Sequence, residues 1–298
     1  MNLNRVALLV NPNAGNQAWL EHLDDVRQTL AQRFANVDIY KTTSAEHAQQ
    51  LVDEIHTNVD VLIGAGGDGT IYQLTNALAR LEQRPVFAIL PCGTANDFSR
   101  AIGMAQDPIA ALEQIMQMKV EPVDIGFDGQ QYFLNFWGIG LITTVSEQVQ
   151  NKDALGRLSY YISTLQNMNE TEPFHVRIQS DTFEYEGEAV MVLVGNSPFT
   201  GGLRAFFPNN HLQDGTFDIL IIKNSTLPTF LQMFRSRITQ LPAEHENVIY
   251  HEAKQLYIEA TPQQNIDCDG ERRYNTPATI KNLQQYLRII VGNDLTPH

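Results

Sequence analysis

The chain has 298 residues and a net charge of −14, and 43% of its residues are apolar. This composition supports a folded core in one large or two ordinary domains, and the negative charge argues against a general nucleic-acid binder and against bulk adhesion to anionic membrane. No apolar run reaches the roughly 18 residues that a membrane-spanning helix needs, and the two cysteines, Cys92 and Cys268, favour a reducing, cytoplasmic setting.

The first third of the chain alternates strand-like and helix-like segments. Apolar runs at 5–12, 37–42, 60–66 and 86–91 are typical of strands, and apolar residues recur at helical spacing over 19–34, 48–55 and 70–84. The first run ends in Asn-Pro, which is typical of an opening strand and not of a secretion signal. The alternation predicts a parallel sheet whose ligands bind beyond the carboxyl ends of its strands. Three loops therefore converge there: "NPNAG" (11–15), the Gly-rich stretch after residue 63, and "PCGTAND" (91–97).

The pattern changes after Val123. Strand-like segments follow at close spacing, at 131–140, 174–180, 183–196, 217–223, 248–260 and 278–291, with helices expected at about 141–168 and 226–241. Such spacing is typical of an antiparallel sandwich or barrel. We therefore predict an α/β domain over 1–123 and a β-rich domain over 124–298, whose last strand or tail either completes the second domain or returns to the first.

The stretch "DVLIGAGGDGTIYQL" (60–74) places four glycines around one acid. The glycines leave backbone N–H groups uncovered, and a helix starting near Thr70 adds its positive end, so the segment predicts an anion-binding turn. Asp68 would repel a phosphate unless a cation lies between them, and magnesium with a nucleotide meets that need. The alternatives are a strand-to-helix turn without a ligand and, for Asp68, a helix N-cap.

Five landmarks together resemble the bacterial diacylglycerol and lipid kinase family, whose relatives include sphingosine and ceramide kinases. They are "NPNAG", "GGDGT" (66–70), "PCGTANDFSR" (91–100), "LQDGTFDILII" (212–222) and "DCDGE" (267–271), in the family's order. The Gly-Gly-Asp-Gly motif is shared with NAD kinases and phosphofructokinases, whereas Gly-Thr-Ala-Asn-Asp-Phe is more specific to lipid kinases. The resemblance implies a Rossmann-like α/β nucleotide-binding domain and an antiparallel β-sandwich that faces the lipid, with ATP in the cleft between them.

The resemblance and the loop positions together give a set of ATP contacts. These are Asn11, Pro12, Asn13, Ala14, Gly15, Thr42, Gly66, Gly67, Asp68, Gly69, Thr70, Ile71, Tyr72, Gly93, Thr94, Asn96 and Asp97. For Thr42 the alternative to an ATP contact is an ordinary threonine at the end of a strand. For Asn96 and Asp97 the alternative is the capping of a short helix. The chain departs from the family at Tyr72 and Gln73, where Asn and Glu are usual, and this removes an anion near the expected nucleotide.

The resemblance also assigns catalytic acids. It implies that Glu271 accepts the proton of the acceptor hydroxyl with help from Asp269, because an alcohol is a poor nucleophile until its proton is removed. On its own, "DCDGE" reads as an exposed acidic turn. In the sphingosine kinase branch the acid of Gly-Gly-Asp-Gly has this role, so Asp68 is the rival base.

A metal site is implied in the Asp-Gly segment of the second domain. Carried over by position, the ligands of a structural Mg²⁺ are the carboxylate of Asp214 and the backbone oxygens of His211 and Thr216. Hard cations favour such oxygen ligands. A hairpin turn at Asp214-Gly215 is the alternative, because Asp-Gly is a strong hairpin signal.

The leading expectation is a kinase that uses ATP and Mg²⁺ on a lipid alcohol, cytoplasmic and peripheral at the inner face of the membrane. Contact with lipid is expected from the loop 197–210, through Phe199, Phe206 and Phe207, more than from the helix 226–241. The expected partners are ATP and the lipid, with no nucleic acid, and the sequence is compatible with a homodimer. A soluble kinase of the NAD type and a nucleotide-binding sensor without turnover are the alternative functions.

Overall fold

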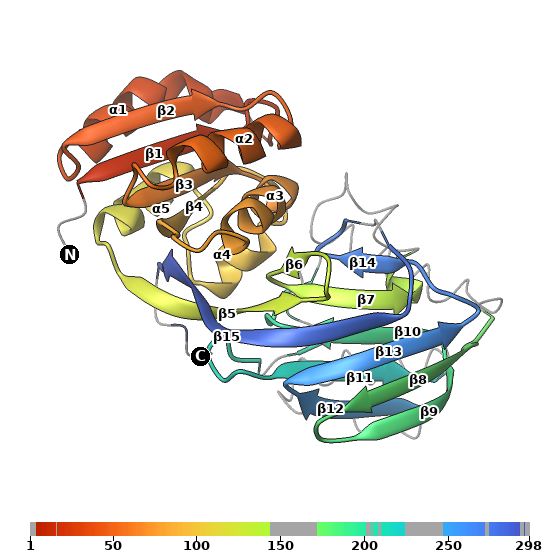
Figure 1. Cartoon of the computed structure of the whole chain (residues 1–298). Coiled ribbons are helices and arrows are strands. Elements are labelled where there is room, and N and C mark those ends of the chain that lie inside the picture. The colour runs from red at the N-terminus through yellow and green to blue at the C-terminus, as the bar shows by residue number, and fades with distance from the viewer. Residues whose placement is uncertain are drawn as a thin grey trace. The chain divides into compact units, whose positions relative to one another are not determined.

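The computed structural model describes residues 4–15, 17–143, 172–200, 204, 206–207, 210–223, 247–271, 274–292 and 295. The chain divides into two compact units, one of residues 1–123 and 285–298 and the other of residues 124–284. Two strands, β5 (Val120–Phe127) and β15 (Ala278–Ile290), run from one unit into the other (Figure 1). The first boundary coincides with the predicted one, and the C-terminal half of the last strand returns to the first unit.

The first unit contains the parallel sheet that the alternation predicts. Its strand order is β2-β1-β3-β4-β15, and β15 joins it where Ile289 pairs with Phe87. The inner strands β1, β3 and β4 are almost wholly buried and read as continuous apolar runs, as expected for a sheet covered on both faces. Apart from β15, the strands of this sheet are β1 Arg5–Val10, β2 Asn36–Lys41, β3 Val61–Gly66 and β4 Val86–Pro91.

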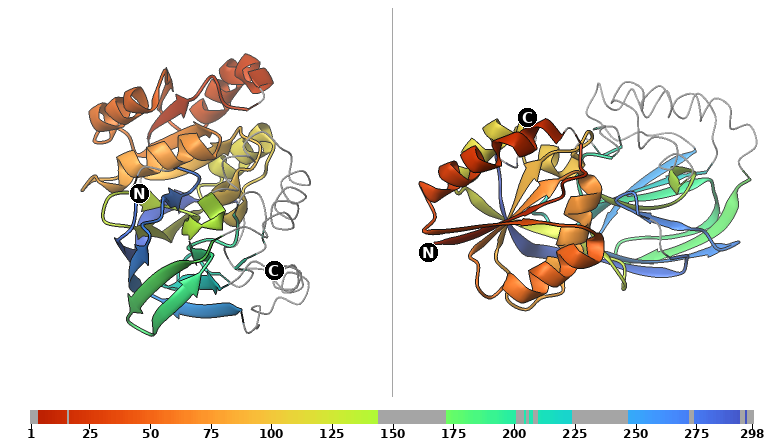
Figure 2. Two further views of the ribbon diagram at one scale, coloured as in Figure 1. Left: turned by 90° about the vertical axis from the view of Figure 1, so that its right-hand side faces the viewer. Right: turned by 90° about the horizontal axis from the view of Figure 1, so that it is seen from above.

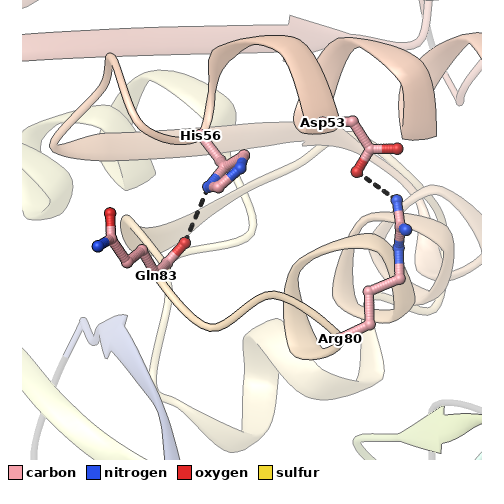
Figure 3. A network of polar contacts seen from close by, with 4 residues as sticks. All are labelled: Asp53, His56, Arg80 and Gln83. Carbon is pink, nitrogen blue, oxygen red and sulfur yellow. Dashed lines mark hydrogen bonds and ion pairs between the residues drawn. The ribbon is translucent and has the colours of Figure 1, made fainter.

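Helices cover both faces of this sheet (Figure 2). On one face α1 contacts α5, and on the other α2 contacts α3. Figure 3 shows the polar side of the second pair, where Arg80 pairs with Asp53 and a ring nitrogen of His56 lies 3.0 Å from the Gln83 carbonyl oxygen. The helices are η1 Gln17–His22, α1 Leu23–Ala31, α2 Ala45–Ile55, α3 Asp68–Ala79, α4 Asp97–Ala101 and α5 Pro108–Met116.

The second unit is an antiparallel sandwich. One sheet continues from β15 in the order β15-β13-β8-β9, and the other has the order β12-β11-β10-β7-β14. Its core includes Trp137, which is fully buried, and the stacked rings of Phe133 and Phe217. The strands are β6 Tyr132–Phe133, β7 Phe136–Gly140, β8 Phe174–Ser180, β9 Glu184–Ala189, β10 Met191–Gly195, β11 Phe217–Ile222, β12 Val248–Ala253, β13 Gln255–Thr261 and β14 Ile266–Cys268.

Two of the predicted strands are each two strands that change sheets. The 183–196 segment splits at Val190 into β9 and β10, and the 248–260 segment splits at Lys254 into β12 and β13. In both pairs the two halves belong to different sheets, so the chain turns a corner of the sandwich there. The 131–140 segment is also interrupted, because Leu134 and Asn135 turn their N–H groups to an acid described below.

The predicted helix over 226–241 and nearly all of the one over 141–168 lie outside the described residues. The helix predicted over 70–84 begins two residues earlier, at Asp68, and ends five residues earlier, at Ala79, with Arg80 as its C-cap. Within the described ranges, no helix combines the length and apolar character needed to cross a membrane.

Candidate functional site

Three loops of the first unit meet at the carboxyl ends of β1, β3 and β4, as the sheet topology predicts. The backbone N–H of Asn11 donates to the Ala65 carbonyl at 3.0 Å, and its side-chain amide donates to the Thr70 hydroxyl at 2.8 Å. The N–H of Ala14 closes a turn on the Asn11 carbonyl at 3.2 Å. These bonds fix the first loop against the start of α3.

Glycines allow the backbones of these loops to come into direct contact. A Cβ atom on Gly15, whose φ is +57°, would lie 1.6 Å from the Cys92 carbonyl oxygen. A Cβ atom on Gly93 would lie 2.5 Å from the Cα of Gly67. Because no side chain fits at these contacts, the loops form a bare peptide surface beside the N-terminus of α3, where helix geometry leaves N–H groups without acceptors inside the helix. Such a surface is suited to phosphate.

The Asp68 side chain caps the start of α4 and not the start of α3, the helix in which Asp68 lies. It is the first residue of α3, whose N-cap is Gly67, so the alternative of Asp68 as N-cap of the following helix is wrong. The Asp68 carboxylate accepts the backbone N–H groups of Asn96 at 2.9 Å and Asp97 at 2.7 Å, at the start of α4. An acid among glycines thus supplies the cap that α4 lacks from its own residues.

Asn96 closes the third loop. Its side chain accepts the Gly93 N–H at 3.0 Å and donates to the Gly93 carbonyl at 2.9 Å, and its own backbone is left-handed, with a φ of +51°. It stands at the N-cap position of α4 without making a side-chain capping bond, and Asp97 contributes its backbone N–H to Asp68. The Asn96 side chain therefore does not cap α4, although Asn96 occupies the N-cap position.

The other predicted ATP contacts lie in different settings. Thr42 is buried after β2, and its hydroxyl donates to the Val10 carbonyl at 3.2 Å. The side chains of Ile71 and Tyr72 are buried on α3, so the substitution at Tyr72 places a ring in the core. Thr94 is exposed. An ATP contact at each of these residues stays a prediction.

In the second unit, residues 268–271 form a tight two-residue hairpin turn. The N–H of Glu271 donates to the Cys268 carbonyl at 2.8 Å, and the N–H of Cys268 donates to the Glu271 carbonyl at 2.9 Å. Asp269 and Gly270 occupy the centre of the turn with φ values of +51° and +89°. Asp-Gly is a favoured pair for such a turn with two left-handed residues.

The Asp269 carboxylate is committed to three backbone amides. It accepts the Leu134 N–H at 2.7 Å and the N–H groups of Asn135 and Phe136 at 2.9 Å each. A carboxylate held by three donors is poorly placed to take a proton from a substrate. Asp269 therefore anchors the turn that carries Glu271, and Glu271 is the better candidate for an acceptor of the substrate proton.

The Asp214 loop precedes β11 and is pinned by a buried acid. Asp214 Oδ1 accepts both the N–H and the hydroxyl of Thr216 at 2.8 Å each. The carboxylate of Asp124, which has no exposed surface, accepts the Gly215 N–H at 2.6 Å. The Asp124 N–H donates to the Leu212 carbonyl at 2.7 Å. The loop is thus tightly turned, as its Asp-Gly pair predicts.

This loop has the oxygen donors that a hard cation prefers. Asp214 and His211 are exposed, and the Thr216 carbonyl accepts one bond, from Asn282 Nδ2 at 3.1 Å, which leaves it a second lone pair. Clusters of three or more His, Cys, Asp or Glu side chains that could hold a metal are absent from the described ranges. The residues fit a Mg²⁺ site with one carboxylate and backbone oxygens, and that site stays a prediction.

Both cysteines are buried and unreactive in character. Burial raises the pKa of the Cys92 thiol to about 12. Burial, followed by the nearby carboxylates of Asp128, Asp269 and Asp267, raises the pKa of the Cys268 thiol well above its usual value. Thiols that stay protonated are poor nucleophiles, so neither cysteine has the character of a redox-sensitive group.

The aromatic loop expected to meet lipid is only partly described. Phe207 is 1% exposed and packs in the core of the second unit, so it is not a membrane-inserting side chain. Phe206 is partly buried against the same cluster, and Phe199 is half-buried. Of the large apolar side chains in the described ranges, only Ile109 and Tyr274 are exposed.

Sequence reasoning missed two residues of the second unit. From the sequence, Asp124 is only the first residue of the predicted second domain, and Asn196 is only the last residue of a predicted strand. Both are buried, at 0% and 1% exposure. A polar residue inside or directly after an apolar strand run was the available signal, because a buried polar group needs partners.

Comparisons with known proteins cover nearly the whole chain. A model of the diacylglycerol kinase catalytic domain matches residues 5–127, and a model of the YegS C-terminal NAD kinase beta sandwich-like domain matches residues 138–291. The chain is 30% identical to a diacylglycerol kinase of Bacillus subtilis (strain 168), with 98% of each chain covered. It is 29% identical to one of Staphylococcus aureus (strain bovine RF122 / ET3-1), with 98% of this chain and 93% of that one covered.

Solved structures agree with these matches. A crystal structure of a diacylglycerol kinase from Bacillus anthracis str. Sterne aligns with a TM-score of 0.80 and 35% identity, over 98% of each chain. A second crystal structure from that strain aligns with a TM-score of 0.87 and 36% identity, also over 98% of each chain.

Proposed function

We propose that this chain, which belongs to the bacterial diacylglycerol and lipid kinase family, transfers the γ-phosphoryl group of ATP to the hydroxyl of diacylglycerol or a related lipid alcohol. Family membership makes the chain a phosphotransferase of the lipid kinase type. The proposal that the donor is ATP and the acceptor a lipid alcohol rests on one observation: three bare-backbone loops meet in a chain that matches diacylglycerol kinases over 98% of its length.

The three loops bind the phosphates of ATP in this proposal. Phosphoryl transfer depends mainly on positioning and on charge stabilisation, and bare amides with a helix N-terminus supply both. The contact between Gly15 and the Cys92 carbonyl sets the spacing of the loops. Asp68 keeps the third loop in place through the amides of Asn96 and Asp97.

Magnesium bound with ATP would neutralise charge on the nucleotide. We propose that a separate, structural Mg²⁺ is bound by the Asp214 carboxylate and by the carbonyl oxygens of His211 and Thr216, because hard cations favour such donors. The buried Asp124 carboxylate holds this loop through the Gly215 N–H.

Glu271 is the proposed base for the acceptor hydroxyl. The rival acids Asp68 and Asp269 both hold backbone amides, at distances of 2.7–2.9 Å. A carboxylate that takes the hydroxyl proton as the oxygen attacks typically contributes about 10²- to 10⁴-fold in rate.

We further propose that the enzyme acts as a peripheral protein at the cytoplasmic face of the membrane. A lipid whose acyl chains are buried in the bilayer presents its hydroxyl only at the membrane surface. The described surface exposes few large apolar groups, and the chain has a net charge of −14, so contact by a general apolar patch or by bulk charge is not part of the proposal.

A soluble kinase acting on NAD is the second candidate function. The observation that favours it is the match of residues 138–291 to a domain described as NAD kinase beta sandwich-like. The full-length relatives described as diacylglycerol kinases favour the lipid.

One assay separates these functions. The purified chain is incubated with γ-labelled ATP, Mg²⁺ and, in separate reactions, vesicles containing diacylglycerol, phosphatidylglycerol, sphingosine or ceramide, or NAD in solution. The proposal predicts label in a glycerolipid. Label in NAD alone, or ATP binding without any transfer, would overturn it.

A further inference from the structure

We propose that Asn196 is a positioning residue that holds the Glu271 turn and the Asp214 loop in one register, an inference that rests on the proposed kinase function. Asn196 follows β10 and is 1% exposed. It contacts neither Glu271 nor Asp214 in any hydrogen bond that the described residues show, so its effect passes through the peptide groups that it binds.

The side chain of Asn196 uses both of its N–H donors and one acceptor site of its oxygen. Its Nδ2 donates to the Leu134 carbonyl at 2.8 Å and to the Asp124 carbonyl at 3.0 Å, and its Oδ1 lies 3.4 Å from Asn282 Nδ2. Its backbone N–H donates to the Asn135 carbonyl at 2.8 Å. The surroundings of this buried side chain require an amide with two donors and an acceptor, because another side chain of this size would leave carbonyl groups unpaired.

The first route from Asn196 leads to the catalytic turn. The carbonyls of Leu134 and Asn135 bind Asn196, while the N–H groups of these same two residues bind the Asp269 carboxylate at 2.7 and 2.9 Å. Asn196 and Asp269 therefore hold the short break between β6 and β7 through opposite groups of its backbone. Because Asp269 opens the turn that carries Glu271, a shift of this break moves Glu271.

The second route leads to the proposed metal loop, and it is double. The Asp124 residue whose carbonyl binds Asn196 also holds the Gly215 N–H with its carboxylate at 2.6 Å. Asn282, which contacts Asn196 Oδ1, donates to the Thr216 carbonyl at 3.1 Å. Thr216 is a proposed cation ligand, so Asn282 contacts a ligand directly, as groups that fix ligand orientation do, and Asn196 acts through Asn282.

The test uses Asn196→Ala with Ser197→Ala as matched control. Ser197 is the next residue and is fully buried, and its hydroxyl donates to Asn135 Oδ1 at 2.9 Å and lies 3.3 Å from the carbonyl oxygen and the N–H of Phe199. Its backbone N–H donates to the Asn135 carbonyl at 3.1 Å, a bond that neither substitution removes, but its side chain binds neither of the carbonyls that the Asn196 side chain holds. Both variants lose buried hydrogen bonding. Only Asn196→Ala is expected to lower kcat at least tenfold and to raise the Mg²⁺ concentration for half-maximal activity at least tenfold, as orienting groups around a metal typically do. The KM for ATP is expected to stay within about twofold, since the ATP loops belong to the first unit.

A second variant separates the two routes. Asn282→Ala removes the contacts to Thr216 and to Asn196 Oδ1 and leaves the bonds from Asn196 to Leu134 and Asn135, so it is expected to raise the Mg²⁺ requirement with a smaller fall in kcat than Asn196→Ala. This variant also decides the inference if Asn196→Ala does not fold. An unchanged Mg²⁺ requirement in a folded Asn282→Ala, or equal kcat in Asn196→Ala and Ser197→Ala, would overturn it.

Two readouts do not depend on turnover. Amide exchange of Leu134, Asn135 and Phe136, and calorimetric titration with Mg²⁺ alone, are measured on the same full-length proteins. Faster exchange and weaker Mg²⁺ binding in Asn196→Ala than in Ser197→Ala support the inference, and equal values contradict it. A wild-type protein that transfers no phosphate to lipid would refute the proposed function, while these two readouts would still decide whether Asn196 positions the turn and the loop.

Discussion

Replacing Asp269 by Asn is expected to destabilise the second unit far more than replacing Glu271 by Gln. The Asp269 carboxylate accepts three backbone N–H groups at 2.7–2.9 Å, and an amide of the same shape keeps only one acceptor atom. The bond to Leu134 is lost, which costs about 1.5–3 kcal/mol, and the bonds to Asn135 and Phe136 lose their charge assistance, about 0.5–1 kcal/mol each. The expected loss in the free energy of unfolding is therefore about 2.5–5 kcal/mol. Glu271→Gln keeps both backbone bonds of the turn and is expected to cost under about 0.5 kcal/mol.

The assay is urea denaturation followed by tryptophan fluorescence. The chain has two tryptophans, Trp19 in the first unit and the fully buried Trp137 in the second, so a Trp19→Phe background makes Trp137 the reporter of the second unit. Asp269→Asn and Glu271→Gln are compared in that background. An Asp269→Asn protein as stable as Glu271→Gln, within about 0.5 kcal/mol, would refute the anchoring role of Asp269.

Three further predictions follow from other contacts. Gly15→Ala places a Cβ atom 1.6 Å from the Cys92 carbonyl oxygen and should weaken ATP binding at least tenfold in calorimetry, since separating the loops costs about 1–3 kcal/mol; equal affinity would contradict the phosphate site. Burial raises the pKa of Asp218 to about 6, above that of the unfolded chain, so its stabilising contribution is complete below about pH 4 and is lost as the pH rises through about 6. Asp218→Asn should therefore gain about 3 kcal/mol relative to wild type between about pH 4 and pH 7, and parallel stability profiles would exclude the shift. Met118 follows α5 with a φ of +55°, so Met118→Gly should stabilise the first unit by about 0.5–1 kcal/mol, while Met116→Gly at the last residue of α5 should cost up to about 1 kcal/mol. Losses of equal size in the two variants would show that the left-handed backbone carries no strain.

Most of the α/β unit was predictable from its sequence because its strands and its first three helical segments are continuous patterns, whereas α5 (Pro108–Met116) was not predicted. Its inner strands are buried on both faces and are therefore uninterrupted apolar runs, and parallel topology alone brings the three glycine loops together. The sandwich was predictable as a class but not strand by strand. An apolar run does not reveal the point at which a strand leaves one sheet for the other, as at Val190 and Lys254.

The site divides in a similar way. Residues that act through the backbone, such as Gly15, Gly67 and Gly93, could be found because glycine is informative on its own. The partners of the acids could not, because Asp68 binds amides 28 and 29 residues away and Asp269 binds amides more than 130 residues away. Sequence spacing carries no information about such contacts, so the separate roles of Asp269 and Glu271 required the structure.

Phosphoryl transfer by Glu271→Gln tests the central claim most directly. Wild type and variant are given γ-labelled ATP, Mg²⁺ and diacylglycerol vesicles, and the ATP dissociation constant is measured on the same preparations. The account predicts that transfer falls about 10²- to 10⁴-fold while ATP binds with unchanged affinity. Undiminished transfer by Glu271→Gln would contradict the assignment of the base and return that role to Asp68.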